Sequence, residues 1–284
     1  MTPTLVRHQL PHAGPAPRVD LCARARDWSE IQERMLVPLY EAVHERLEVG
    51  PGTRLLGLGC GSGLALLMAA SRGAAVTGVD SSPERLALAR ARLQPGARGP
   101  RPRVAARIVE GSPRDAAGTG TPPYTLVTAF EPLGCRAGDA ERLDAQLSAA
   151  LPLAGRGAAV VLVGWGPPER CATSGVLRAA GGPVDAACGA GRPRFPLRDD
   201  LEETAERNGL RPDGSGRVAC PFGYADTDSA VRGLMSTGLF DRAVAAADRT
   251  QVGKELAEAL TPFVRRGGTV WMPNVFRYLV ARVR

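Results

Sequence analysis

The sequence predicts an α/β fold in which a mostly parallel sheet is covered by helices on both faces. Short apolar runs alternate with amphipathic stretches from Thr53 onward. A turn with glycines at alternate positions follows the first apolar run, and an acidic residue ends the second. Apolar strands that alternate with helices are typical of parallel sheets buried on both faces.

The alternating pattern places each element in turn. Strands are expected at residues 54–58, 75–79, 104–109, 125–129, 158–163 and 218–222. Helices are expected at residues 63–71, 82–93, 139–151, 169–180 and 199–208, with two or three more in 226–247 and 251–264. A final strand is expected at 269–283, entered by a hairpin across Gly267 and Gly268.

An amphipathic helix is predicted before the first strand, after a Pro-rich tail at residues 1–22. Ser29-Glu30-Ile31-Gln32 resembles a capping box that opens this helix. Apolar residues then recur every four positions, which fits one helical face: Ile31, Met35, Leu39, Val43 and Leu47. Pro38 is expected to bend or split the helix.

The glycine-rich turn and the acid after it predict a nucleoside site. The turn lies in the segment 55–63, and Asp80 follows nineteen positions after Gly61. A backbone without side chains lets a ligand approach closely. An acid at the end of the second strand can accept hydrogen bonds from two ribose hydroxyls.

The whole pattern resembles the class I S-adenosylmethionine-dependent methyltransferases, especially small-molecule enzymes similar to those of quinone biosynthesis. The resemblance covers about residues 28–284. It is carried by residues 55–63 with Asp80, by Trp165-Gly166-Pro167-Pro168-Glu169, and by the closing strand at 269–282. It implies a Rossmann-like sheet of seven strands, mostly parallel with the last strand antiparallel, and a helical cap.

The resemblance also implies how the chain is organised. A tail and cap helix would occupy residues 1–50, a nucleoside-binding core residues 51–165, and the rest of the sheet with a helical cap insertion residues 166–284. These parts would form one integrated domain. Helices before the glycine-rich turn and between the last two strands would cover the substrate.

Carried over position by position, the resemblance assigns a set of cofactor-binding residues. They are Trp28, Tyr40, Gly57, Gly59, Cys60, Gly61, Gly63, Asp80, Ser81, Gly111, Ser112, Pro113, Ala129 and Phe130. The glycines of the turn would contact the methionine portion and ribose, and residues 111–113 the adenine. Residues 129–131 would face the sulfonium, and Trp28 and Tyr40 would help to close the pocket.

Two positions depart from the family pattern. Gly57 stands where the family usually has an acidic residue, and Ser112 stands where it usually has Asp. A hydrogen bond to a charged group contributes roughly 1.5–3 kcal/mol. Loss of the acid at position 57 would therefore weaken cofactor binding by about ten- to a hundredfold if nothing replaces it. Ser112 can still accept one bond through its hydroxyl.

Glu131 is the expected catalytic residue, because it follows the fourth strand at the ligand-binding edge of the sheet. Methyl transfer from a sulfonium needs little acid–base help, since in-line approach supplies much of the acceleration. A hydroxyl acceptor would still benefit from a general base. Glu131 could equally cap the next helix. Other candidate bases are His8, His12, His44 and Tyr224, with His44 expected on the surface.

Composition excludes several classes of function. The chain has 284 residues and a net charge of +7, but its arginines are scattered and Lys254 is its one lysine, so nucleic-acid binding is not expected. No apolar run is long enough to span a bilayer. Six dispersed cysteines without a CxxC pair predict free thiols in a bacterial cytoplasm and no metal site. We expect a monomer or homodimer.

Three functions remain open from the sequence. The first is an enzyme that transfers a methyl group from S-adenosylmethionine to a small molecule. The second is a regulatory or accessory protein that binds S-adenosylmethionine or S-adenosylhomocysteine with impaired catalysis, which Gly57 and Ser112 would suit. The third is a nicotinamide-dependent oxidoreductase, which the spacing of Gly59, Gly61 and Gly63 disfavours because that class needs GxGxxG.

Overall fold

The computed structural model describes residues 19–94, 105–118, 120, 122–134, 138–180, 199–246 and 248–284. Its centre is a seven-stranded sheet with the order β3-β2-β1-β4-β5-β9-β6. These strands are β1 (Arg54–Leu58), β2 (Ala75–Asp80), β3 (Ala106–Glu110), β4 (Tyr124–Leu133), β5 (Ala154–Trp165), β6 (Arg211–Ala219) and β9 (Val275–Arg282). Strand β9 runs antiparallel to its neighbours β5 and β6, and the other pairs are parallel. The predicted fold class is confirmed.

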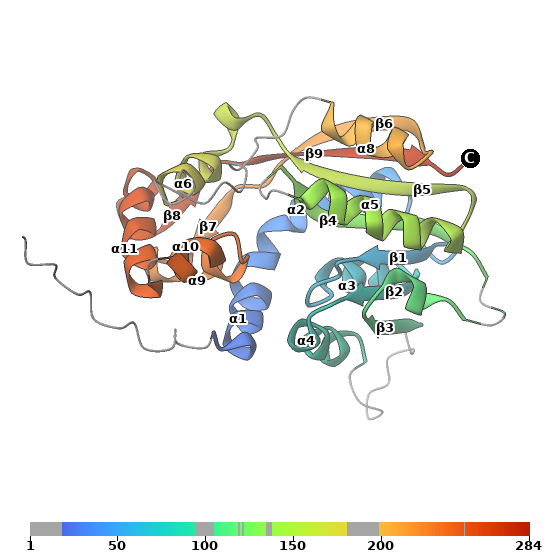
Figure 1. The fold of residues 1–284 in the computed structure, drawn as a ribbon, viewed down its shortest axis with the longest axis horizontal. Helices are drawn as coiled ribbons and strands as arrows, with labels where there is room; N and C mark the ends of the chain where they lie inside the picture. Colours follow the sequence, from blue (N-terminus) through green and yellow to red (C-terminus); the bar gives the residue numbers. More distant parts are fainter. Residues whose placement is uncertain are drawn as a thin grey trace, which may run out of the picture.

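Helices cover both faces of the sheet (Figure 1). The helices of the described residues are α1 (Leu21–Asp27), α2 (Val37–Arg46), α3 (Leu64–Ser71), α4 (Pro83–Leu93), α5 (Asp139–Ala150), α6 (Ala172–Ala180), α8 (Asp200–Arg207), α9 (Thr227–Ser236), α10 (Asp241–Ala246) and α11 (Arg249–Leu260). Alternate residues of each strand point to opposite faces. Leu55 therefore packs with α2 and α3, whereas Leu56 packs with α5 and α8.

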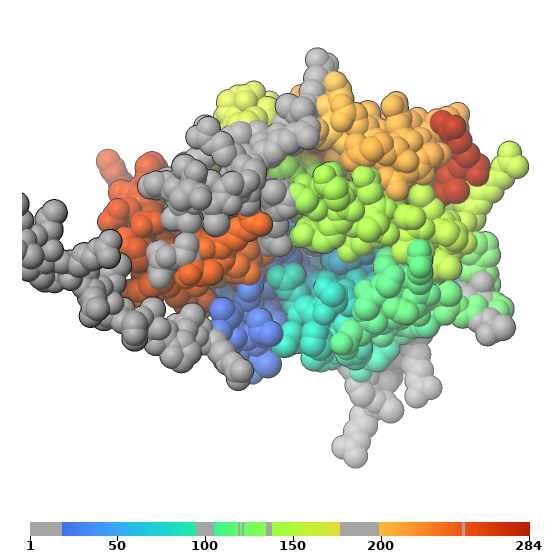
Figure 2. All heavy atoms as spheres, viewed as in Figure 1, coloured from blue at the N-terminus to red at the C-terminus, as the bar shows by residue number. Residues whose placement is uncertain are grey.

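A helical cap lies beside one end of the sheet. Figure 1 shows α6, α9, α10 and α11 gathered there, together with the short hairpin of β7 (Phe222–Tyr224) and β8 (Val270–Met272). The cap and the face of the sheet that packs against α2 and α3 share one apolar core. In Figure 2 the blue residues of the N-terminal helices lie between the orange residues of the cap and the cyan residues of α3 and α4. The N-terminal segment thus connects the cap to the sheet.

The N-terminal helix begins earlier than predicted. It starts at Leu21, where the Asp20 side chain caps it by accepting a hydrogen bond from the Ala23 N–H at 3.0 Å. The predicted capping box at Ser29 is wrong, because that residue lies within a continuous helical run and its hydroxyl accepts from Arg92 instead. Pro38 lies in the first turn of α2, after π-helical and 3-10 turns, so the helix is split as expected.

The sheet edge also differs from the prediction. The expected strand at 218–222 is instead the end of β6 followed by the separate strand β7. The expected strand at 269–283 is split into β8 and β9 at Pro273, whose ring removes a donor from any ladder. None of the helices in the described part of the chain combines the length and apolar character needed to cross a bilayer.

Candidate functional site

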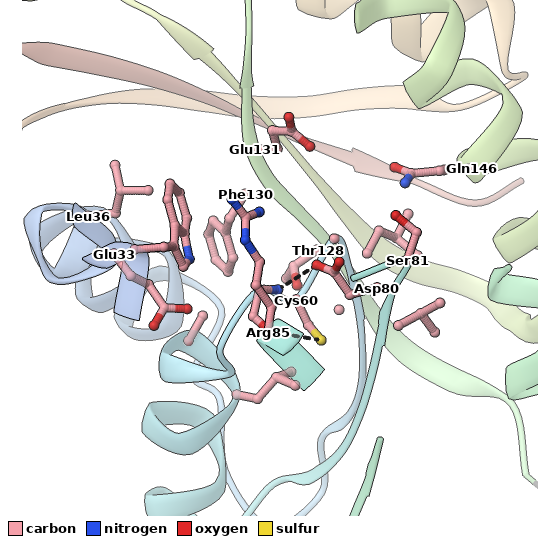
Figure 3. Close-up of a pocket in the computed structure, with 18 of the residues that line it drawn as sticks. Glu33, Leu36, Cys60, Asp80, Ser81, Arg85, Thr128, Phe130, Glu131 and Gln146 are labelled. Atoms are coloured by element: carbon pink, nitrogen blue, oxygen red, sulfur yellow. Dashed lines mark hydrogen bonds between the residues drawn. The ribbon is translucent and has the colours of Figure 1, made fainter. Parts of the chain in front are cut away.

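A cavity of about 280 Å³ opens at the carboxyl ends of β1, β2 and β4. The strand order reverses between β1 and β4, and ligands of open α/β sheets bind at this kind of switch point. Figure 3 shows Asp80 near the centre of the cavity, with Glu33 and Leu36 on one side and Gln146 on the other. The cavity therefore joins the sheet edge to the N-terminal helical segment.

The Asp80 carboxylate organises the centre of the site. Its Oδ2 accepts a hydrogen bond from the Gly61 N–H at 2.8 Å, and its Oδ1 accepts one from the Ser82 N–H at 2.9 Å. An ionised carboxylate has about four lone-pair sites. Two of them hold the glycine-rich turn and the start of α4, and the others are available for a ligand in the cavity that Asp80 lines.

Gly61 permits the N-terminal segment to approach the turn. Its φ of +57° is costly for residues with a side chain, and an added Cβ would lie 3.0 Å from Trp28 Nε1. This indole nitrogen is buried and has no hydrogen-bond partner among the described residues. The Arg85 guanidinium lies 4.5 Å from the centre of the Trp28 ring and also lines the cavity. An indole donor and a guanidinium thus adjoin one end of the cavity.

Glu33 fastens the N-terminal segment to the same turn. Its side chain is 3% exposed. It accepts hydrogen bonds from the Ser62 hydroxyl, from the Leu64 N–H at 3.3 Å and from Arg92 Nη1 at 2.7 Å. The guanidinium of Arg92 also donates to the Ser62 carbonyl at 2.9 Å. These contacts join the N-terminal segment, the turn and α4 in one buried polar network.

Aromatic side chains close the cavity on the side of α2. The rings of Tyr40 and Phe130 are tilted, with centroids 4.8 Å apart, and both residues line the cavity. Gly57 also lines it, but the space beside its Cα is filled, since an added Cβ would lie 2.9 Å from Leu66 Cδ2. A larger side chain at position 57 would require Leu66 to move.

A second, smaller cavity of about 80 Å³ adjoins the first. The two share Trp28, Leu36, Glu131 and Arg142 among their lining residues. Glu131 follows the cavity-facing Phe130 on β4, and it pairs with Arg142 of α5 at 3.1 Å. Its side chain is 52% exposed. A carboxylate therefore lies at the junction of the two cavities.

Comparison with known proteins finds a match for the central part of the chain. Residues 55–151 match the family model of a methyltransferase domain. A search of curated protein sequences found no match.

Similar solved structures extend this likeness to the whole fold. They include S-adenosylmethionine-dependent methyltransferases from Geobacter sulfurreducens and Thiobacillus denitrificans, each in complex with S-adenosyl-L-homocysteine. Each is 16% identical, with a TM-score of 0.53 over 94% of this chain and 99% of the other. The cyclase SpnF is 18% identical, with a TM-score of 0.50 over 86% of this chain and 80% of its own. The chain shares the fold of these proteins.

Most of the sequence-predicted cofactor residues line the large cavity. These are Trp28, Tyr40, Gly57, Gly59, Cys60, Gly61, Asp80, Ser81, Gly111, Pro113 and Phe130, together with Glu131. Three predicted residues lie elsewhere. An added Cβ at Gly63 would lie 3.1 Å from Ala89, so this glycine packs α3 against α4. The Ser112 hydroxyl accepts from the Arg114 N–H in a capping box, and Ala129 packs in the core on the opposite face of the sheet.

Several lining residues were missed by the sequence reasoning. Glu33, Arg85, Thr128 and Gln146 all line the large cavity. Thr128 could have been found, because it lies two positions before Phe130 on one strand and so shares its face. The other three come from helices whose orientation the sequence pattern does not give.

Two other candidate groups are unsuited to proton or nucleophile chemistry. Burial, and then the charge of Asp80, raises the pKa of the Cys60 thiol, so it stays protonated. Burial also raises the pKa of the Tyr224 phenol, which donates a hydrogen bond to Gln32 Oε1 at 2.9 Å. His8 and His12 lie outside the described residues. No group of three or more His, Cys, Asp or Glu side chains in the described ranges gathers to hold a metal ion.

His44 is buried, which corrects the expectation of a surface histidine. It is 0% exposed, and neither ring nitrogen has a hydrogen-bond partner among the described residues. Its ring meets Phe130 edge-on, with centroids 6.1 Å apart. Burial, and then the charge of Arg72, lowers the pKa of His44 from 6.5 to about 4. The imidazole is therefore neutral at pH 7.

This burial predicts a loss of stability in mild acid. The folded protein resists protonation of His44 until pH falls to about 4, whereas the unfolded chain protonates it near pH 6.5. The unfolded state thus binds more protons between these values, so the free energy of unfolding falls as pH drops through this window. We expect the titration of His44 to lower the free energy of unfolding by about 2 kcal/mol between pH 7 and pH 5. Denaturant unfolding of wild type and His44→Leu across pH 5–7 checks this, and parallel curves would contradict it.

Proposed function

We propose that the chain transfers a methyl group from S-adenosylmethionine to a small molecule. The observation that carries this proposal is the pair of adjoining cavities, one built on the glycine-rich turn and Asp80 and the other mainly apolar. A cofactor in the first cavity and an acceptor in the second would meet beside Glu131. The remaining lone pairs of Asp80 suit two ribose hydroxyls.

The two ends of the large cavity fit the rest of the cofactor. Gly111 and Pro113 lie at one end, after β3, where the adenine would rest. Trp28 lies against Gly61 at the glycine-rich turn, and its buried Nε1 lacks a partner among the described residues. A buried donor without a partner is costly, and the carboxylate of the methionine portion would satisfy it. We infer that this orphan N–H supports recognition of the amino-acid end.

Methyl transfer from this cofactor depends more on the positioning of the acceptor than on acid–base catalysis. The cofactor supplies an electrophilic methyl group on a good, neutral leaving group. The residues of the second cavity would hold the acceptor in line with it. Glu131, which pairs with Arg142 at 3.1 Å, would take the proton of a hydroxyl acceptor. An amine or carbon acceptor would use the same geometry.

A second candidate function is binding of the cofactor without turnover. Two observations favour it, because at each of two positions a contact that the family usually has is missing. Position 57 has no carboxylate and its space is filled by Leu66. The Ser112 hydroxyl is engaged in the cap of the turn after β3. Fold alone does not decide between the two functions.

Calorimetry and label transfer test both functions. We expect S-adenosylmethionine and S-adenosylhomocysteine to bind, and methyl-labelled S-adenosylmethionine to label compounds in a small-molecule extract. Heat-inactivated protein is the control for spontaneous transfer. Binding without any transfer would favour the second function, and failure of both nucleosides to bind would contradict both.

A further inference from the structure

The second cavity has an aromatic end built from three strands. Trp165 ends β5, Phe222 lies on β7 and Phe276 lies on β9. The Trp165 and Phe276 ring centroids are 4.5 Å apart, and the Phe222 and Phe276 rings are stacked at 6.1 Å. All three line the cavity, as do Leu234 and Leu239 of the cap. Aromatic walls of this kind favour a planar, apolar ligand.

One residue of this lining, Thr173, has a hydroxyl without a partner among the described residues. Thr173 is 1% exposed, and its Oγ1 is buried with no hydrogen-bond partner among the described residues. Its backbone N–H donates to Asn274 Oδ1 at 3.1 Å, which holds it beside the start of β9. By contrast, the equally buried Thr204 donates its hydroxyl to the Asp200 carbonyl at 2.7 Å. A buried polar group without a partner is the exception in folded proteins and calls for an explanation.

The charged groups lie toward the large cavity. Glu131 and Arg142 are shared between the two cavities and pair with each other at 3.1 Å. Asp139 also lines the second cavity, so the charged groups that the described residues bring to its lining are two carboxylates and one guanidinium. The excess of carboxylates disfavours an anionic ligand, and the aromatic walls with the Thr173 hydroxyl suit an uncharged one.

We propose that the acceptor is an uncharged aromatic molecule whose ring packs among Trp165, Phe222 and Phe276. One oxygen of this molecule accepts a hydrogen bond from the Thr173 hydroxyl. The group that receives the methyl lies at the other end of the ring, toward Glu131. This inference rests on the proposed function, because it assigns the second cavity to the acceptor.

Three phenols that differ at one group test the ligand chemistry. The probes are 4-hydroxyacetophenone, which has a carbonyl opposite its hydroxyl, 4-ethylphenol, which lacks that oxygen, and 4-hydroxybenzoate, which carries a charge there. Binding is measured by calorimetry with S-adenosylhomocysteine present. We expect 4-hydroxyacetophenone to bind about three- to tenfold more tightly than 4-ethylphenol, and 4-hydroxybenzoate to bind most weakly. Equal affinities, tightest binding of the benzoate, or no binding of any probe would overturn the proposal.

Thr173→Val supplies the protein side of the test. It removes the hydroxyl and keeps the shape, so the preference for 4-hydroxyacetophenone should disappear while affinity for 4-ethylphenol stays unchanged. The Tm should not fall, because the lost hydroxyl had no partner. In the matched control Thr204→Val, a satisfied hydroxyl is lost, and we expect the Tm to fall by about 2–4 °C with ligand preference unchanged. Retention of the preference in Thr173→Val would overturn the assignment.

The order of the measurements distinguishes failure of this inference from failure of the proposed function. S-adenosylhomocysteine binding is measured first, without any phenol. If it binds and the phenols show no preference, the acceptor class is wrong and the cofactor assignment stands. If it does not bind, the proposed function is wrong, and the phenols are then measured on the protein alone to judge the aromatic cavity.

Discussion

Asp80→Asn is expected to weaken the binding of S-adenosylhomocysteine by about a hundredfold or more. The carboxylate holds the Gly61 and Ser82 N–H groups, and its remaining lone pairs are proposed to accept two ribose hydroxyls. Hydrogen bonds to a charged acceptor contribute roughly 1.5–3 kcal/mol each. The substitution keeps the shape and one acceptor oxygen but removes the charge. Calorimetry of both proteins with S-adenosylhomocysteine measures the change.

Glu110→Gln is the matched control for Asp80→Asn. Glu110 ends the neighbouring strand β3 in register with Asp80, and its side chain is exposed. This variant changes the net charge of the same sheet edge by the same amount. We expect it to bind S-adenosylhomocysteine within about twofold of wild type, since exposed charges interact weakly. If Asp80→Asn bound as tightly as this control, Asp80 would not be a ribose ligand.

The fold was predictable wherever local signals mark the ends of elements. β1 has the predicted bounds, and the helices after it begin within about one residue of prediction, because Gly63 and Ser82-Pro83 mark their starts. The edge strand β6 was missed for a physical reason. Most of its residues are exposed, so it has no apolar alternation, and backbone pairing with β9 forms it.

The candidate site, too, was predictable only where local signals mark it. The turn and Asp80 are close in sequence, and the strand–turn–helix pattern places them together. Glu33 reaches Ser62 from 29 positions away, and Arg92 joins from a third element. No periodicity or motif signals such a contact, because it depends on how the N-terminal segment crosses the sheet edge. Sequence reasoning therefore found the turn and Asp80 but not the network that holds the N-terminal segment over them.

Loss of this buried network should lower both stability and cofactor affinity. Glu33→Gln keeps the shape of the side chain but leaves Arg92 without its carboxylate partner. Breaking a buried ion pair costs about 3–5 kcal/mol, and because the Arg92 side chain is 22% exposed we expect about 3 kcal/mol here. The helical segment that carries Trp28 and Tyr40 would then be less firmly held over the turn. We expect S-adenosylhomocysteine to bind about tenfold more weakly.

Denaturant unfolding and calorimetry of a double-mutant cycle measure this effect. The cycle compares Glu33→Gln, Arg92→Gln and the double variant, and the coupling between the two positions isolates the pair. Glu45→Gln is the control, because its partner Arg72 lies 4.0 Å away and the Glu45 side chain is 72% exposed. An exposed pair of this kind contributes about 0–1 kcal/mol. A coupling energy between positions 33 and 92 no larger than the Glu45→Gln effect would show that the network does not hold the N-terminal segment in place. The rigidity of the large cavity would then need another source.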